Sequence, residues 1–147
     1  MKKRIPDIIC ALLILLFAYT AFSKLVEFEK FRNVLSEAPV IGNEAAFLAA
    51  VIPVAELIIV LLLLIPKTKK PGLSTATGLL IVFTVYLVFM VLTDPHLPCS
   101  CGGVIQQLSW KQHIVFIAFF IGLGITGIYY QRKEDRDNQR TEIIEHT

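Results

Sequence analysis

Four long apolar stretches constrain the fold of this chain more than any other feature of its sequence. Each is close to the roughly 20 residues that a helix needs to cross the hydrocarbon core of a bilayer. Hydrophobic residues make up 55 % of the 147 residues, a surplus that one small soluble core could not bury. The sequence predicts an all-α, integral membrane four-helix bundle over residues 1–130, with helices at about 5–24, 45–65, 73–92 and 113–130. A polar cytoplasmic tail, 131–147, is expected to be disordered or frayed.

The first stretch has a second interpretation, as a cleavable signal peptide. Lys2, Lys3 and Arg4 form a basic start, and small residues up to Ser23 loosely resemble a cleavage site. Cleavage would leave three membrane helices, so whether the first helix is retained or cleaved stays open at this stage.

Lysine and arginine are distributed unevenly between the segments that flank the four stretches. With the N-terminus inside, ten of them fall in cytoplasmic segments and four in outer segments, which matches the positive-inside rule. The predicted topology is therefore N-in/C-in. The net charge of +2 gives no reason to expect nucleic-acid binding. The inner residues are Lys2, Lys3, Arg4, Lys67, Lys69, Lys70, Arg132, Lys133, Arg136 and Arg140, and the outer ones are Lys24, Lys30, Arg32 and Lys111.

An amphipathic segment is expected outside the membrane, between the first and second helices. Leu25, Phe28, Phe31 and Leu35 recur at helical spacing, with charged residues between them. Such a helix would lie on the outer surface or cap the bundle.

The most reactive residues lie in the second outer loop, in Pro98-Cys99-Ser100-Cys101-Gly102-Gly103. Two cysteines one residue apart can close a disulfide, but the small ring restricts the backbone and makes the bond easy to exchange. We expect Cys99 and Cys101 to act in redox chemistry, with His113 as a candidate to take up a proton. An inert bridge and half of a metal site stay open as alternatives, although two thiolates alone do not make a metal site and no metal is predicted. Cys10, in the first stretch, is expected to be a small buried apolar residue.

Glu56 is the second unusual residue, because it lies about halfway along a predicted membrane helix. An ionisable group at that depth is costly and usually faces the bundle interior. Lys24 is the basic residue nearest in depth, but it is predicted to lie shallower, so pairing requires it to reach inward or a kink near Pro53. Glu56 could instead be protonated and bonded to Tyr86 or Thr84. A structural contact and a role in proton or ligand handling both stay open.

The chain resembles a known group of membrane proteins. Ala21-Phe22-Ser23-Lys24-Leu25 and Val51-Ile52-Pro53-Val54-Ala55-Glu56-Leu57 are similar to segments of DoxX-type four-helix membrane proteins. With Cys99, Cys101, Trp110 and His113 added, the chain resembles the redox-associated MauE branch of that superfamily over roughly residues 5–130. The resemblance implies a bacterial cytoplasmic (inner) membrane protein with its cysteine loop on the periplasmic side. MauE is associated with maturation of a disulfide-rich periplasmic enzyme in methylamine utilisation. Nothing in this chain points to methylamine itself.

The leading functional hypothesis is a thiol–disulfide oxidoreductase that exchanges with a periplasmic protein or a thioredoxin-like carrier through Cys99 and Cys101. The rival is a non-enzymatic scaffold or maturation factor, in which the cysteines form an inert bridge. A variant of the leading hypothesis adds a bound quinone, with Glu56 handling its protons, but the chain lacks the second outer cysteine pair common in such enzymes. A third hypothesis, small-solute or ion transport, rests on Glu56 alone. Gly122, Gly124 and Gly127 permit close helix packing, and a homo-oligomer is left open.

Overall fold

The structure, a computed structural model, describes residues 4–37, 42–93 and 110–145 of the chain. All regular elements within these ranges are helices, which confirms the predicted all-α class. Four helices are long: α1 (Arg4–Val26), α3 (Ala45–Leu64), α4 (Lys69–Thr93) and α5 (Trp110–Glu145). The short elements are α2 (Phe28–Glu37) and two 3-10 turns, Gly42–Glu44 and Pro66–Thr68.

Four segments of the described residues are long and apolar enough to cross a membrane, which confirms the predicted four-helix membrane bundle. They are Arg4–Val26, Gly42–Leu64, Pro66–Thr93 and Gln112–Ile144. Large apolar side chains point outward from them, among them Leu15 at 72 %, Val82 at 65 % and Val115 at 69 % exposure. Apolar surface of this extent suits contact with lipid rather than water. The chain is therefore a multi-pass membrane protein.

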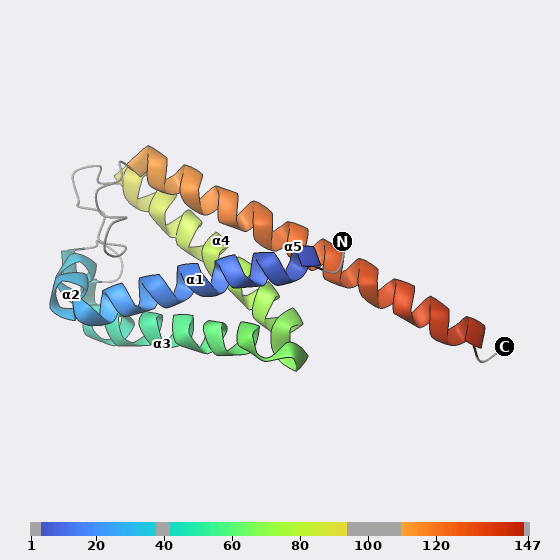
Figure 1. The fold of residues 1–147 in the computed structure, drawn as a ribbon. Coiled ribbons are helices and arrows are strands. Elements are labelled where there is room, and N and C mark those ends of the chain that lie inside the picture. The colour runs from blue at the N-terminus through green and yellow to red at the C-terminus, as the bar shows by residue number, and fades with distance from the viewer. Residues whose placement is uncertain (1–3, 38–41, 94–109, 146–147) are drawn as a thin grey trace.

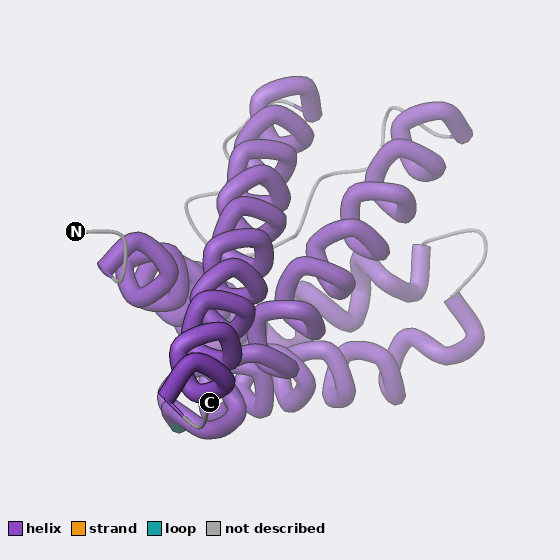
Figure 2. Tube along the Cα trace, turned by 90° about the vertical axis from the view of Figure 1, so that its right-hand side faces the viewer, coloured by secondary structure: helices purple, strands orange, loops and turns teal. Residues whose placement is uncertain are grey.

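The long helices form two pairs that pack into one bundle. Helices α1 and α3 run side by side, and so do α4 and α5, while α1 also contacts α5 and α3 contacts α4 (Figure 1). The start of α1, the turn between α3 and α4, and the end of α5 all lie at one end, from which Figure 2 is viewed. Helix α2 lies at the other end, called the α2 end below. The predicted N-in/C-in topology requires both ends of the chain to lie at the same end of the bundle, as the start of α1 and the end of α5 do here. Which side of the membrane that end faces is still a prediction from the distribution of Lys and Arg.

The apolar core runs between the four long helices. Leu13 of α1, Leu63 of α3 and Leu73 of α4 are completely buried and belong to one cluster, which Ile117 of α5 joins. Cys10 is buried in the same cluster, which confirms the expectation that it packs as a small apolar residue. Burial of whole side chains on all four helices stabilises one arrangement of the bundle.

Helix α2 is the predicted amphipathic segment, and it caps the bundle. Phe31 and Leu35 are buried against Ala45 and Ala49 at the start of α3. Leu25, the first member of the predicted apolar stripe, lies instead in α1 and is 46 % exposed. A turn at Glu27 separates the two helices, so the apolar stripe of α2 begins only after it.

The expectation of a disordered or frayed tail is wrong. Helix α5 continues for 36 residues, to Glu145, well beyond the predicted end at residue 130. Residues 131–145 are rich in Gln, Arg, Lys and Glu, which favour helices, and adding residues to an existing helix avoids the cost of nucleation. An ion pair between Asp135 and Lys70 of α4 also holds the first turns of this extension.

Two exposed ion pairs join the helices at the end opposite α2, and we expect them to contribute little to stability. Lys69 Nζ lies 2.7 Å from Asp7 Oδ1, with the Asp7 side chain 64 % exposed, and Lys70 pairs with Asp135. Asp7→Asn and Asp135→Asn should each lower the free energy of unfolding by less than about 1 kcal/mol, because water and salt screen such pairs. Thermal unfolding of the purified protein in detergent at low and high salt measures this. A loss of several kcal/mol would contradict it.

Candidate functional site

A small cavity of about 50 Å³ lies between the four long helices, in the half of the bundle towards α2. Most of its lining is apolar and includes Phe17 of α1 and Phe116 of α5. Four polar side chains interrupt this lining: Thr20, Lys24, Glu56 and His113. They come from α1, α3 and α5, so the fold gathers residues that are up to 93 positions apart in the sequence (113 − 20).

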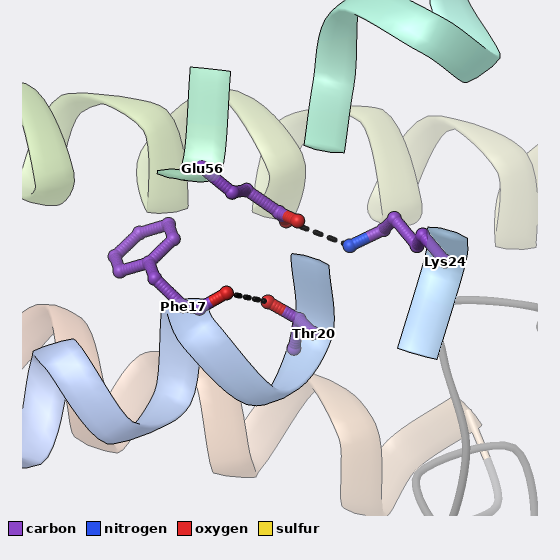
Figure 3. A network of polar contacts seen from close by, with 4 residues as sticks. All are labelled: Phe17, Thr20, Lys24 and Glu56. Atoms are coloured by element: carbon purple, nitrogen blue, oxygen red, sulfur yellow. Dashed lines mark hydrogen bonds and ion pairs between the residues drawn. The ribbon is translucent and has the colours of Figure 1, made fainter. Parts of the chain in front are cut away.

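Lys24 and Glu56 form a buried ion pair across the cavity. Lys24 Nζ donates a hydrogen bond to Glu56 Oε1 over 2.7 Å, and the two residues are only 3 % and 2 % exposed (Figure 3). Tyr86 and Thr84 were the other predicted partners of Glu56, and of these Thr84 bonds elsewhere. Thr84 Oγ1 donates instead to the carbonyl oxygen of Leu80, one turn earlier in its own helix.

The pair forms across an offset along the two helices. Glu56 lies eleven residues, about 16 Å at 1.5 Å per residue, beyond Ala45 at the start of α3. Lys24 lies in the last turn of α1, and its side chain points back along that helix towards Glu56 (Figure 3). The pair therefore forms in one of the two ways that the sequence allowed, with Lys24 reaching inward.

Two aromatic rings flank the ammonium group of Lys24. Its Nζ lies 5.7 Å from the ring centroid of Phe31 in α2 and 5.6 Å from that of Phe83 in α4. Both distances are within the range of cation–π attraction, which is strongest where water is excluded. Sequence reasoning did not find these contacts. Phe31 was assigned only to the apolar stripe of α2, and Phe83 looked like an ordinary membrane residue.

Two buried polar atoms of the site have no hydrogen-bond partner among the described residues. They are Glu56 Oε2 and His113 Nδ1, and His113 as a whole is 3 % exposed. Thr20 lies beside Glu56, but its hydroxyl donates to the carbonyl oxygen of Phe17 over 3.2 Å (Figure 3). Buried groups without partners are uncommon because they lose their hydration and gain nothing in return. Their presence in one cavity marks it as a site that can bind a small polar species.

The structure thus brings together three of the residues singled out from the sequence. Lys24, Glu56 and His113 line one cavity. The sequence had linked Lys24 with Glu56 but had linked neither of them with His113. Cys99 and Cys101 lie outside the described residues. Within the described ranges, no cluster of three or more His, Cys, Asp or Glu side chains could hold a metal ion.

Comparison with known proteins identifies the family of the chain. The family model described as "Methylamine utilisation protein MauE" matches residues 2–130. No curated protein and no solved structure matches the chain. The matched region includes all of α1 to α4 and the apolar part of α5, together with every residue of the cavity. This chain, a multi-pass membrane protein with a buried Lys24–Glu56 pair, therefore belongs to the MauE family.

Proposed function

We propose that this protein is a membrane thiol–disulfide oxidoreductase that serves the maturation of a partner protein outside the cytoplasm. In this proposal it lies in a bacterial cytoplasmic membrane, and Cys99 and Cys101 exchange disulfides with a periplasmic protein or a thioredoxin-like carrier. One observation carries the proposal. Buried Lys24, Glu56 and His113 gather in the α2 half of the bundle, where His113 lies in the first turn of the helix that follows the cysteine segment.

Short segments of chain join the cysteine pair to α4 and α5. Cys99 follows Thr93, the last residue of α4, by six positions, and Cys101 precedes Trp110, the first residue of α5, by nine. An extended chain spans at most about 3.3–3.6 Å per residue, so Cys99 stays within about 20 Å of the end of α4. His113 is the fourth residue of α5, at the end of its first turn. The short connections are compatible with exchange on the same side of the membrane as the α2 end.

The proposed exchange is balanced between the two proteins. A thiolate of the partner attacks one sulfur of the Cys99–Cys101 disulfide, forms a mixed disulfide, and releases the other sulfur as a thiolate. The second partner thiol then displaces the first cysteine. In total two electrons and two protons pass from the partner dithiol to this pair, which oxidises the partner, and the same steps in reverse would reduce a partner disulfide. A bridge between neighbouring positions gains little stability from loop closure, which favours easy opening.

The redox state of the pair in membrane vesicles tests the proposal. In a Cys10→Ala background, a membrane-impermeant thiol reagent should label Cys99 and Cys101 after mild reduction with glutathione or dithiothreitol. Cys99→Ser and Cys101→Ser should each abolish exchange with a thioredoxin probe. Cys10→Ala alone is the matched control, because Cys10 is buried away from the cavity, and it should keep full exchange.

The rival function is a scaffold, and the exposed face of α2 favours it as the second candidate. The apolar side of α2 is fixed against α3, while Glu29, with its side chain 71 % exposed, and Arg32, at 43 %, form an ion pair on its outer side. This helix could hold a partner without any redox step. Two results together would favour the scaffold over exchange. The bridge would open only under strong reductant, and a partner would still co-purify with the double cysteine variant.

A further inference from the structure

The cavity between the four long helices has the features of a built binding site for a small molecule. We propose that it binds water, and that the bound water joins Glu56 Oε2 of α3 to His113 Nδ1 of α5. The water then forms a neutral polar link between the α1/α3 pair and the α4/α5 pair. This site lies wholly among described residues, and it does not depend on the exchange chemistry proposed above.

Two side chains that are almost completely buried each have one polar atom without a partner at this cavity. Glu56 is 2 % exposed and His113 is 3 % exposed, and neither Glu56 Oε2 nor His113 Nδ1 has a hydrogen-bond partner among the described residues. Both residues line the same space. Because a buried polar atom loses free energy when nothing replaces its hydration, two such atoms in one cavity indicate a ligand that bonds to both.

The charges around the cavity favour a neutral ligand. Lys24 Nζ donates to Glu56 Oε1 over 2.7 Å, so the ammonium group and the carboxylate of the lining balance each other. A further cation would lie near Lys24 and a further anion near Glu56, and repulsion between like charges is strong where water is excluded. The rings of Phe31 and Phe83 flank the ammonium group and help to hold it on Oε1, which leaves Oε2 as the free acceptor.

The volume of the cavity and the bonds that water can form both fit this assignment. The cavity measures about 50 Å³, and in the same measure one water needs about 10–15 Å³ and two to four polar partners. Water can donate to a carboxylate oxygen and can either donate to or accept from an imidazole nitrogen, so it suits both tautomers of His113. The hydroxyl of Thr20, which lines the cavity beside Glu56, donates to the carbonyl oxygen of Phe17 over 3.2 Å and can still accept a bond from water.

The position of the site in the fold explains why a polar link is useful there. Figure 1 shows that the α1/α3 pair and the α4/α5 pair separate towards the α2 end. Glu56, bonded to Lys24, belongs to the first pair, and His113 lies at the end of the first turn of α5 in the second. The other α4 and α5 residues among the described lining are apolar. In that lining, His113 is therefore the polar contact that the second pair offers to the first.

Radiolytic labelling detects the bound water in the full chain in detergent. A short X-ray pulse converts ordered water into hydroxyl radicals, which oxidise the side chains beside it, and mass spectrometry locates the products. Phe17, which lines the cavity, should be oxidised. The matched control is Cys10, which lies on the same helix, is also 2 % exposed, and is outside the lining. Cys10 should stay unmodified although its sulfur is readily oxidised. If Phe17 were oxidised no faster than Cys10, the cavity would hold no water and the proposal would be overturned.

A double variant tests whether the water is held by the carboxylate. Lys24→Met/Glu56→Leu replaces the ion pair with apolar side chains and leaves neither charge without a partner, so the bundle should keep its fold. Oxidation of Phe17 should then fall to the level of Cys10. Undiminished oxidation of Phe17 in the folded double variant would show that the water does not bind to Glu56, and would overturn the assignment.

The link to His113 is tested by NMR in protein labelled with ¹⁵N-histidine. The His113 signals are assigned by their loss in His113→Asn. The Nδ1 signal should shift in the double variant, because its partner is lost, but not in Thr84→Val, a half-buried change on α4 outside the cavity. A His113 signal that is insensitive to the loss of Glu56 would overturn the link, even if water were found in the cavity.

Discussion

Lys24→Met is expected to destabilise the bundle by about 3–5 kcal/mol, because it leaves the carboxylate of Glu56 buried without its partner. Methionine keeps most of the apolar stem of lysine, so the packing in α1 changes little. The loss comes from the bond between Lys24 Nζ and Glu56 Oε1 and from the desolvated charge that remains. An effect of this size reduces the folding equilibrium constant by two to four orders of magnitude, at about 1.4 kcal/mol per factor of ten.

Reversible unfolding in mixed detergent micelles, followed by circular dichroism, measures this loss. Lys30→Met is the matched control. Lys30 lies on α2, its side chain is 56 % exposed, and its ion pair with Glu27 has a separation of 3.7 Å. Because exposed pairs contribute about 0–1 kcal/mol, the control should remain close to the wild type. Equal losses in the two variants would mean that Lys24 and Glu56 do not form a stable pair in the protein.

The double variant Lys24→Met/Glu56→Leu separates two contributions to stability. One is the stabilisation that the ion pair itself provides, and the other is the penalty for a buried charge that has lost its partner. Removing both partners leaves an apolar site, and such replacements are often neutral or stabilising. We expect it to recover most of the stability that Lys24→Met loses. A double variant that is less stable than either single one would instead indicate that the pair itself stabilises the fold.

The membrane-spanning part of the fold could be predicted from the sequence because a bilayer imposes a length on each apolar helix. The start of α3 agrees with its prediction, and α2 followed from the spacing of Phe31 and Leu35. The ends of α5 could not be predicted in the same way. Past residue 130 the apolar signal ceases, but helix propensity and the existing helix keep the backbone in the same conformation.

The site could be predicted only as separate residues. Glu56 and Lys24 were recognisable because a charge inside an apolar stretch is costly and has to be compensated. Their contact depends on how α1 and α3 pack side by side and on the Lys24 side chain pointing back along α1. Hydropathy contains no information about such offsets. The approach of His113 to the same cavity depends likewise on how α5 packs against α1.

The glycines of α5 provide the second large expected effect. A Cβ at Gly124 would overlap the Thr77 side chain of α4, whereas a Cβ at Gly122 would meet nothing within 4 Å. Thr77 cannot easily turn away, since its Oγ1 donates to the carbonyl oxygen of Leu73 over 2.8 Å and its χ1 is restricted by β-branching. The predicted close packing thus applies to Gly124 and not to Gly122.

Gly124→Ala should therefore cost about 1–3 kcal/mol by overpacking the contact between α4 and α5. Gly122→Ala, on the same helix and of the same chemistry, should be neutral or should stabilise by up to about 1 kcal/mol, because alanine is the better helix former. Unfolding in mixed micelles compares the two directly. Adding Thr77→Ala to Gly124→Ala should restore most of the loss, since it removes Oγ1, the atom that the new methyl group would overlap most, together with Cγ2. If the two alanine variants behaved alike, or if Thr77→Ala gave no rescue, α4 and α5 could not be in close contact at Gly124.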